Sequence, residues 1–420
     1  MSLKSVRFLF LVFVFCSQGL WAQQNLQYNN HTYDTNIRTV RLNPAGNNVQ
    51  SSIAPPVTKV GQSNLMLSFD DLKEDADYYY VYFVHCNANW ESSNLRPNMF
   101  LKNYNEFEIT DFEFSQEAKQ QYVNYTFTIP AFEISGNYLA VVYRNRNKKD
   151  LVLSQRFYVY EENTAVGISV QRSTEQIHRV NNQRIEVSLN YAGLKAVDPR
   201  EQFKIVVRQN QRPDLTRYEL PPTFIDENAQ FIRYQGLDEV FDFPGTNEFR
   251  AFDLSTTTFT GRRVDEIYMS NRRVVAQLRT DAPLADTYLQ NLDINGQYYI
   301  RDVEGQPGGI SAEYVYTNFR LKIPKSDEKV YVVGAFNNWQ KNSASLMKYN
   351  EVEEAYEAEI LLKQGWYNYS YIQEGANPFG IDGSFFETEN LYEVFVYFSP
   401  MGGRGDRLVG YSQLGYNTRR

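Results

Sequence analysis

The chain has 420 residues, a formal net charge of −8 and a sequence pI near 5.2. This acidic balance argues against a nucleic-acid-binding surface, because phosphate binding needs clustered excess cations. Phenylalanine and tyrosine are abundant, at 28 and 32 residues, and large aromatic side chains suit the pleated surface of a β-sheet. At roughly 150 residues per domain, a chain of this length is expected to form two to four domains.

The first 22 residues have the layout of a secretory signal peptide. Lys4 and Arg7 supply positive charge, Phe8–Phe15 is an apolar run, and Leu20–Ala22 ends with a small residue before Gln23. The apolar run is too short to span a bilayer, and a buried N-terminal strand fits this three-part layout less well. We therefore predict cleavage near Ala22 and a soluble mature protein in the periplasm.

The cysteines bear on anchoring and on stability. Cys16 raises the alternative of a lipoprotein, but Phe15 stands where a lipobox needs a small residue. After cleavage only Cys86 remains, so no intramolecular disulfide can form even in an oxidising compartment. Stability is therefore expected to come from burial alone.

Short runs of alternating residues, separated by turn residues, recur along the whole chain. In YEAEIL at 356–361, the acidic side chains point to one face and the others to the opposite face, which is typical of a half-buried strand. Many short strands spaced about ten residues apart are typical of β-sandwiches. We predict an all-β fold of Ig-like and E-set β-sandwich domains in series.

Charged, proline-led and glycine-rich segments suggest the domain boundaries. Glu161–Asn163 follows one predicted strand and precedes another, Pro324–Asp327 reads as a linker, and the segment after Pro400 is rich in glycine. The predicted division is a signal peptide at 1–22, an N-terminal Ig-like sandwich at 23–163, a middle sandwich at 164–325, a C-terminal E-set-like sandwich at 326–400 and a flexible tail at 401–420.

Sequence signatures of catalysis and of cofactor binding are missing. His31, His85 and His178 lie far apart, no pair of them has metal-ligand spacing, and there is no HExxH, CxxC, GxSxG or Walker A motif. His85 fits a packed strand residue, and Cys86 would need a positioned base to act as a nucleophile. Paired carboxylates of the glycosidase kind stay open, since 50 acidic residues allow many pairs. We predict a protein that is not an enzyme and that holds no cofactor and no metal.

Two acidic segments could be mistaken for calcium sites. Asp70–Asp77 offers many carboxylates but lacks the spaced ligand order of a defined calcium loop, so a solvated loop between strands is predicted. Asp293–Gly296 resembles the start of an EF-hand loop without its later glutamate, and Asn295–Gly296 is predicted to be the type I′ turn of a hairpin. Arg404–Asp406 spells an adhesion tripeptide by chance.

One motif resembles a known sugar-binding module. Residues 330–339 (VYVVGAFNNW), with the later segment 356–372, resemble the E-set β-sandwich of glycogen-binding modules. In those modules the tryptophan of the turn lies against a sugar ring and a lysine on a later hairpin helps to bind it. Trp339 matches that tryptophan, but Ser370 takes the place of the lysine, so the sugar site is incomplete. We predict that Trp339 packs in the sandwich, and Trp339 and Trp366 are kept as candidate binding residues.

A set of ordered sequence blocks resembles the plug proteins of the type IX secretion system of Bacteroidota. The resemblance runs from about residue 31 to 323, with the GAFNNW segment following, and rests on the order and spacing of the blocks 33–44, 67–72, 85–95, 109–115, 135–143, 151–159, 206–214, 243–254 and 292–300. It implies a periplasmic protein that caps the periplasmic mouth of the outer-membrane translocon, a β-barrel, and keeps the pore shut. It implies no role for any single residue.

Two other readings of the chain stay open. A secreted carbohydrate-binding or glycan-processing protein would use the domain around Trp339. A cargo protein of the same secretion system is expected to end in a C-terminal sorting domain, whereas this chain ends in residues 411–420 after a loosely packed segment.

Overall fold

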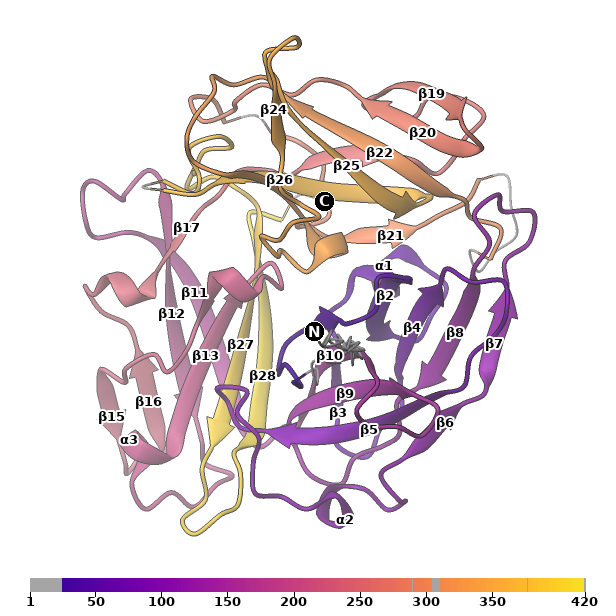
Figure 1. Cartoon of the computed structure of the whole chain (residues 1–420). Coiled ribbons are helices and arrows are strands. Elements are labelled where there is room, and N and C mark those ends of the chain that lie inside the picture. The colour runs from indigo at the N-terminus through magenta and orange to yellow at the C-terminus, as the bar shows by residue number, and fades with distance from the viewer. Residues whose placement is uncertain (1–24, 289, 304–309, 376, 419–420) are drawn as a thin grey trace, which may run out of the picture.

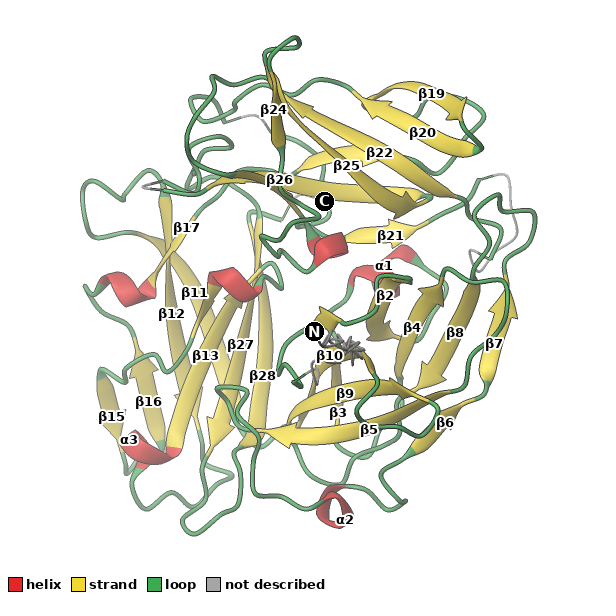
Figure 2. Ribbon diagram, viewed as in Figure 1, coloured by secondary structure: helices red, strands yellow, loops and turns green. Residues whose placement is uncertain are grey.

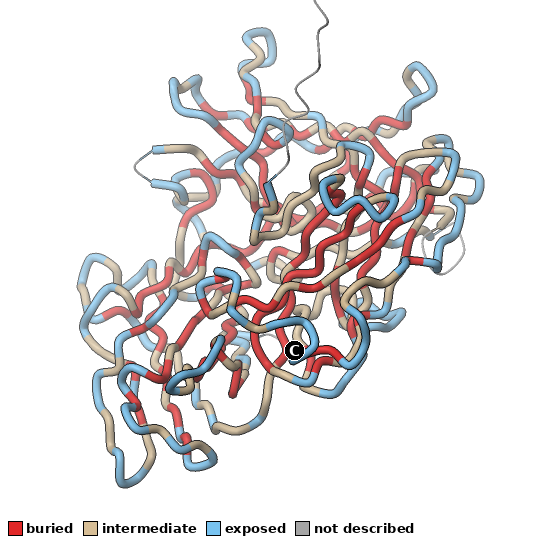
Figure 3. Tube along the Cα trace, turned by 60° about the horizontal axis from the view of Figure 1, so that its bottom comes forward, coloured by how far each residue is buried: buried red, intermediate tan, exposed pale blue. Residues whose placement is uncertain are grey.

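The computed structural model contains three β-sandwiches that meet at one junction (Figures 1 and 2). It describes residues 25–288, 290–303, 310–375 and 377–418, so the predicted signal peptide lies outside the described residues. Buried residues gather in the interior of the molecule, and exposed residues lie mainly in the projecting segments at its periphery (Figure 3). The all-β prediction is confirmed. No described helix is long and apolar enough to cross a membrane.

The N-terminal domain is a sandwich of two sheets. One sheet has the order β1-β10-β9-β5-β6, with β3 beside β10, and the other has the order β2-β4-β8-β7. The elements are β1 (His31–Thr32), β2 (Ile37–Pro44), α1 (Val49–Ile53), β3 (Val57–Lys59), β4 (Leu65–Asp71), β5 (Tyr79–Cys86), α2 (Pro97–Phe100), β6 (Phe107–Ile109), β7 (Asp111–Phe114), β8 (Val123–Thr128), β9 (Gly136–Arg144) and β10 (Leu151–Tyr160). Aromatic rings fill the space between the sheets; Phe69, for example, stacks on Tyr125 with centroids 5.2 Å apart. Stacked and edge-on rings of this kind stabilise a core beyond their buried area.

His85 and Cys86, at the end of β5, are buried core residues. The Nδ1 atom of His85 lies 2.8 Å from Oγ of Ser93, and its Nε2 atom lies 3.2 Å from the carbonyl oxygen of Ser135. Burial lowers the pKa of His85 to about 4 and raises the pKa of Cys86 to about 12. At neutral pH the imidazole is therefore uncharged and Cys86 is a thiol, not the thiolate that nucleophilic chemistry needs.

The middle domain is closed by strands from the C-terminal end of the chain. One sheet has the order β11-β12-β16-β15, with β17 beside β12, and the other has the order β14-β13-β27-β28. The elements are β11 (Ala165–Arg172), β12 (Asn182–Asn190), α3 (Pro199–Gln202), β13 (Phe203–Gln209), η1 (Pro213–Leu215), β14 (Thr216–Arg217), β15 (Phe224–Asp226), β16 (Phe231–Tyr234), η2 (Glu239–Phe241), β17 (Asp242–Pro244), β27 (Asn390–Phe398) and β28 (Arg407–Tyr416).

The third domain lies between β17 and β27 in the chain, so it is an insertion into the middle domain. Its larger sheet has the order β19-β20-β22-β25-β24, and in the facing sheet β18, β21 and β23 all pair with the long strand β26. The elements are β18 (Arg250–Asp253), β19 (Val264–Ser270), β20 (Arg273–Leu278), β21 (Tyr298–Ile300), β22 (Tyr314–Leu321), β23 (Val330–Val333), η3 (Ala335–Asn337), β24 (Lys348–Asn350), β25 (Ala355–Lys363) and β26 (Gly365–Gln373).

The strand pairing corrects three details of the predicted organisation. A boundary at residue 325 would separate β22 from β25, which pair along their whole length in one sheet. The tail predicted at 401–420 was wrong, because it contains β28, which pairs with β27 from Asn390 to Phe398. Asn295 and Gly296 form a turn with positive φ angles, as predicted, but the predicted hairpin is wrong, because the strand that follows pairs with β26.

The returning strand makes the C-terminal residues essential to the middle domain. We predict that deletion of residues 401–420 destroys the fold of this domain, because Leu408 and Val409 are fully buried and β27 loses its neighbour. Limited proteolysis should then cut within residues 165–244, which the intact protein protects. Deletion of residues 417–420 alone, beyond the end of β28, is the control and should leave the protease pattern unchanged.

The burial of His85 predicts a loss of stability in acid. The unfolded chain takes up a proton near the ordinary pKa of 6.5, whereas the folded chain resists protonation until about pH 4, so the free energy of unfolding falls as the pH is lowered through this window. Between pH 6.5 and pH 4.5 this difference in protonation should lower the free energy of unfolding by about 2 kcal/mol. Urea unfolding at pH 6.5 and pH 4.5 should show a smaller loss for His85→Gln than for the native chain. An equal loss in both would contradict the assignment to His85.

Candidate functional site at the junction of the three domains

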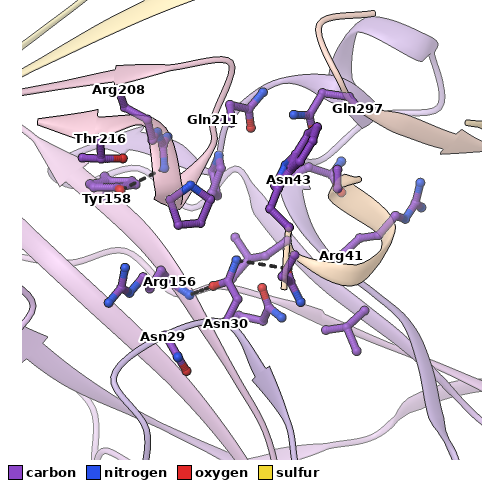
Figure 4. Close-up of a pocket in the computed structure, with 18 of the residues that line it drawn as sticks. Asn29, Asn30, Arg41, Asn43, Arg156, Tyr158, Arg208, Gln211, Thr216 and Gln297 are labelled. Carbon is purple, nitrogen blue, oxygen red and sulfur yellow. Dashed lines mark hydrogen bonds between the residues drawn. The ribbon is translucent and has the colours of Figure 1, made fainter. Parts of the chain in front are cut away.

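A cavity of about 280 Å³ lies where the three domains meet (Figure 4). The N-terminal domain contributes residues from the segment before β1, from β2 and from β10. The middle domain contributes residues of β13 and of the following turn, and the third domain contributes the segment around η3. The cavity therefore exists only in the assembled chain.

Carboxamide side chains dominate the lining of this cavity. They are Asn29, Asn30, Asn43, Gln155, Gln211, Gln297, Asn338 and Gln340. Asn30 binds residues of two domains: its Oδ1 atom accepts a hydrogen bond from the backbone N–H of Arg156 at 2.8 Å, and its Nδ2 atom donates to Oδ1 of Asn338 at 3.4 Å (Figure 4). A carboxamide can donate and accept at once, so it suits a seam between independently folded surfaces.

The charged groups of the cavity are largely committed to structural contacts. Arg208 binds both carboxylate oxygens of Glu393, at 2.8 and 2.9 Å, and also donates to the hydroxyl of Tyr158 at 3.0 Å. Asp214, the one carboxylate in the described lining, is paired with Arg212 at 2.6 Å. The described lining contains neither histidine nor cysteine.

Three buried polar atoms of the lining have no hydrogen-bond partner in the protein. They are Oδ1 of Asn29, Nε of Arg41 and Nε2 of Gln155. A buried polar atom without a partner costs about 1 to 3 kcal/mol, so bound water is the simplest way to satisfy these atoms in a polar cavity.

A buried ion pair joins the N-terminal domain to the third domain. Nζ of Lys363 in β25 lies 2.8 Å from Oδ2 of Asp70 in β4, and the hydroxyl of Tyr314 donates to the same oxygen at 2.7 Å. Burial lowers the pKa of Lys363, although Asp70 partly offsets this effect. Breaking such a pair leaves a buried charge unpaired, which typically costs 3 to 5 kcal/mol.

The same geometry corrects the interpretation of the acidic segment. Asp70 and Asp71 belong to β4 and are fully buried, so the prediction of a solvated loop from Asp70 to Asp77 is wrong for these two residues. Asp71 accepts a hydrogen bond from the hydroxyl of Tyr79 at 2.7 Å. The Oδ2 atom of Asp70 thus accepts from Lys363 and Tyr314, and that of Asp71 accepts from Tyr79.

The two candidate tryptophans lie at different depths. Trp339 is only 6% exposed, and the guanidinium of Arg212 lies 4.1 Å from the centroid of its ring. Trp366 is half-buried, with Arg262 at 5.6 Å from its ring. Ser370, at the position of the lysine in sugar-binding modules, donates to Asp382 at 2.6 Å. The guanidinium of Arg212 thus covers one face of the Trp339 ring.

Gly334 is required by a close approach and not by an unusual φ angle. Its backbone is extended, and a Cβ atom at this position would lie 2.5 Å from the ring of Phe336 and 2.8 Å from the carbonyl oxygen of Asn368. The left-handed residues of the turn are instead Asn338 and Trp339, with φ angles of 54° and 59°. The resemblance to glycogen-binding modules stays a prediction.

The structure also brings together three possible metal ligands that the sequence analysis did not connect. Donor atoms of Glu175, His178 and Glu239 all lie within 4.8 Å of one another, the first two in the segment between β11 and β12 and the third in η2. A search for pairs of histidines misses this group, whereas the Glu-x-x-His spacing of Glu175 and His178 would have pointed to half of it. The absence of a metal stays a prediction.

One comparison with known proteins names a family, and another finds the same fold. Residues 37–161 match the sequence profile of the "Type 9 secretion system plug protein 1st domain", and this segment coincides with the N-terminal sandwich from β2 to the end of β10. A search of curated protein sequences gave no match. The fold matches the crystal structure of a hypothetical protein from Parabacteroides merdae, with a TM-score of 0.87 and 28% sequence identity over 93% of this chain and 100% of that chain. Residues 37–161 of this chain thus belong to the first-domain family of the type 9 secretion system plug proteins.

Proposed function

We propose that this protein is a non-catalytic plug, which binds the periplasmic mouth of the outer-membrane translocon of the type 9 secretion system and seals it. Membership of the plug protein family ties the chain to type 9 secretion. The observation that carries the finer proposal is the locking of three domains into one body by buried polar and aromatic contacts. A seal needs a rigid body of this kind, because only a plug that keeps its shape keeps a pore closed.

The seam between the N-terminal and middle domains supports this rigidity. The ring of Tyr158 in β10 stacks on Phe395 in β27 with centroids 4.4 Å apart, and the hydroxyl of Tyr397 donates to Oδ1 of Asn137 at 2.7 Å. Both middle-domain residues belong to the returning strand β27. Aromatic burial and directed hydrogen bonds together fix the relative orientation of the two sheets.

The size of the protein also suits a seal. A compact body of about 400 residues has a radius of gyration of about 21 Å, so it is about 50 Å across. It could present the roughly 800 Å² per partner that a stable protein interface buries and still leave bulk to occupy the pore. Catalysis, unlike a seal, does not require a body large enough to fill a pore.

The plug proposal predicts a leak on loss of the protein. Deletion of the gene should increase the uptake of large hydrophilic antibiotics, because the translocon barrel is left open on its periplasmic side. Secretion should fall little, since the barrel and its cargo-recognition partners remain. Uptake is compared between the single deletion and a strain that lacks both this protein and the translocon, where the leak should disappear. Equal leakage in both strains, or none in either, would refute the plug function.

A second test separates plugging from binding of sugar. If Trp339 packs as the structure indicates, Trp339→Ala should lower the free energy of unfolding by about 3 kcal/mol or more, as loss of a buried aromatic does. Chemical denaturation measures this loss, and isothermal titration with maltooligosaccharides should show no binding to the native chain. Trp366→Ala, at a half-buried position, should cost less stability. Measurable glucan binding that a stable Trp339→Ala variant abolishes would favour the carbohydrate-binding alternative.

A further inference from the structure

Strand β7 is an unpaired edge of the N-terminal domain. It pairs with β8 on one side, and the sheet order β2-β4-β8-β7 places no described strand on its other side. All four of its residues are exposed, and Figure 1 shows the strand on the outer side of the domain. Backbone groups along such an edge are free to pair with another extended segment.

On one face of β7, apolar side chains extend the hydrophobic core out to the exposed surface. Phe112 lies opposite Tyr125 and Phe114 lies opposite Val123, and both partners are buried between the two sheets. Phe112 and Phe114 therefore point to the core side of their sheet, yet they are 43% and 52% exposed. Their rings lie 5.8 Å apart, centroid to centroid, and form one apolar strip.

The other face of β7 is acidic. Side chains alternate along a strand, so Asp111 and Glu113 point away from the core, beside Thr126 and Asn124. Both carboxylates are exposed, and neither forms an ion pair with a described lysine or arginine. The free edge thus presents phenylalanines on one face and uncompensated negative charge on the other.

We propose that β7 is the docking edge for the translocon, which adds an extended segment to the sheet as an extra strand. The inference rests on the proposed plug function and names the surface that performs it. The added segment carries apolar residues on the face of Phe112 and Phe114, and lysine or arginine on the face of Asp111 and Glu113. Main-chain hydrogen bonds supply affinity in this mode, and the alternating side chains supply specificity.

The middle domain provides a matched control edge. Strand β15 is also the edge of its sheet, and Phe224 at its start is 51% exposed, close to the value for Phe114. Phe224 lies opposite Arg233, which is exposed, and the neighbouring Ile225 packs against the core instead. A change at Phe224 therefore alters an exposed aromatic residue of similar area without touching an open core face.

The test measures binding of the full-length mature chain to the purified translocon. Two variants change β7, one with Phe112→Lys and Phe114→Lys and one with Asp111→Lys and Glu113→Lys, and Phe224→Lys is the control. Thermal unfolding first confirms that each variant is folded. Each β7 variant should bind about tenfold more weakly or worse, and the control should bind like the native chain.

Hydrogen exchange then separates strand addition from a contact of side chains only. In the complex, amide exchange in residues 111–114 should slow by at least about tenfold, because added main-chain hydrogen bonds protect the edge. Native binding by the β7 variants, or unchanged exchange at β7 in the complex, would overturn the docking edge and leave the plug function standing. Failure of the native chain to bind the translocon would instead refute the proposed function itself.

Discussion

The return of the C-terminal strands to the middle domain is the constraint on which the rest of the structure depends. β27 and β28 complete a sheet with β13, in which Phe203 pairs with Phe398, 195 residues later in the chain. The third domain is therefore held at both of its ends by the middle domain. A domain held by two connections has far fewer orientations open to it than one on a single linker. This restriction allows exact polar contacts to form at its seams.

Those seams use charged groups in a way that favours orientation over net stability. The pair Asp70–Lys363 and the group Arg208–Glu393–Tyr158 each place charges in positions closed to water. Desolvation offsets much of the attraction in a buried pair, so apolar residues could have held the domains together equally well. A misaligned charge, in contrast, is severely penalised. The two groups thus disfavour every arrangement of the domains except the one observed.

The alternation of side chains along the sequence predicted the strands of this protein, but it could not predict which distant strands pair with each other. Alternation in segments such as 356–361 indicated strands correctly, and the strands of the N-terminal domain all find their partners within residues 31–160. β28 was missed because the glycine-rich turn before it resembles a loose tail and its partner's sheet is completed by distant residues. The prediction of a loop at Asp70 was wrong because the buried partner of its carboxylate, Lys363, is 293 residues away in the chain and cannot be recognised from the local sequence. The junction cavity has no sequence signal, because its lining comes from three separate domains.

Because the three domains form one rigid body, a contact at one domain positions the whole molecule. A partner that holds only the N-terminal domain also positions the third domain through Asp70 and Lys363, and the middle domain through Tyr158 and Phe395. In three independently mobile domains, the same contact would leave two domains free to move, and each would add an ordering cost to any seal. Because contacts within the chain already fix the domains before binding, this ordering cost is absent from the binding step. The carboxamide-lined junction then has a clear role: it keeps three separately folded sandwiches in one orientation without a continuous apolar core, and so lets a binding surface on one domain govern the placement of all three.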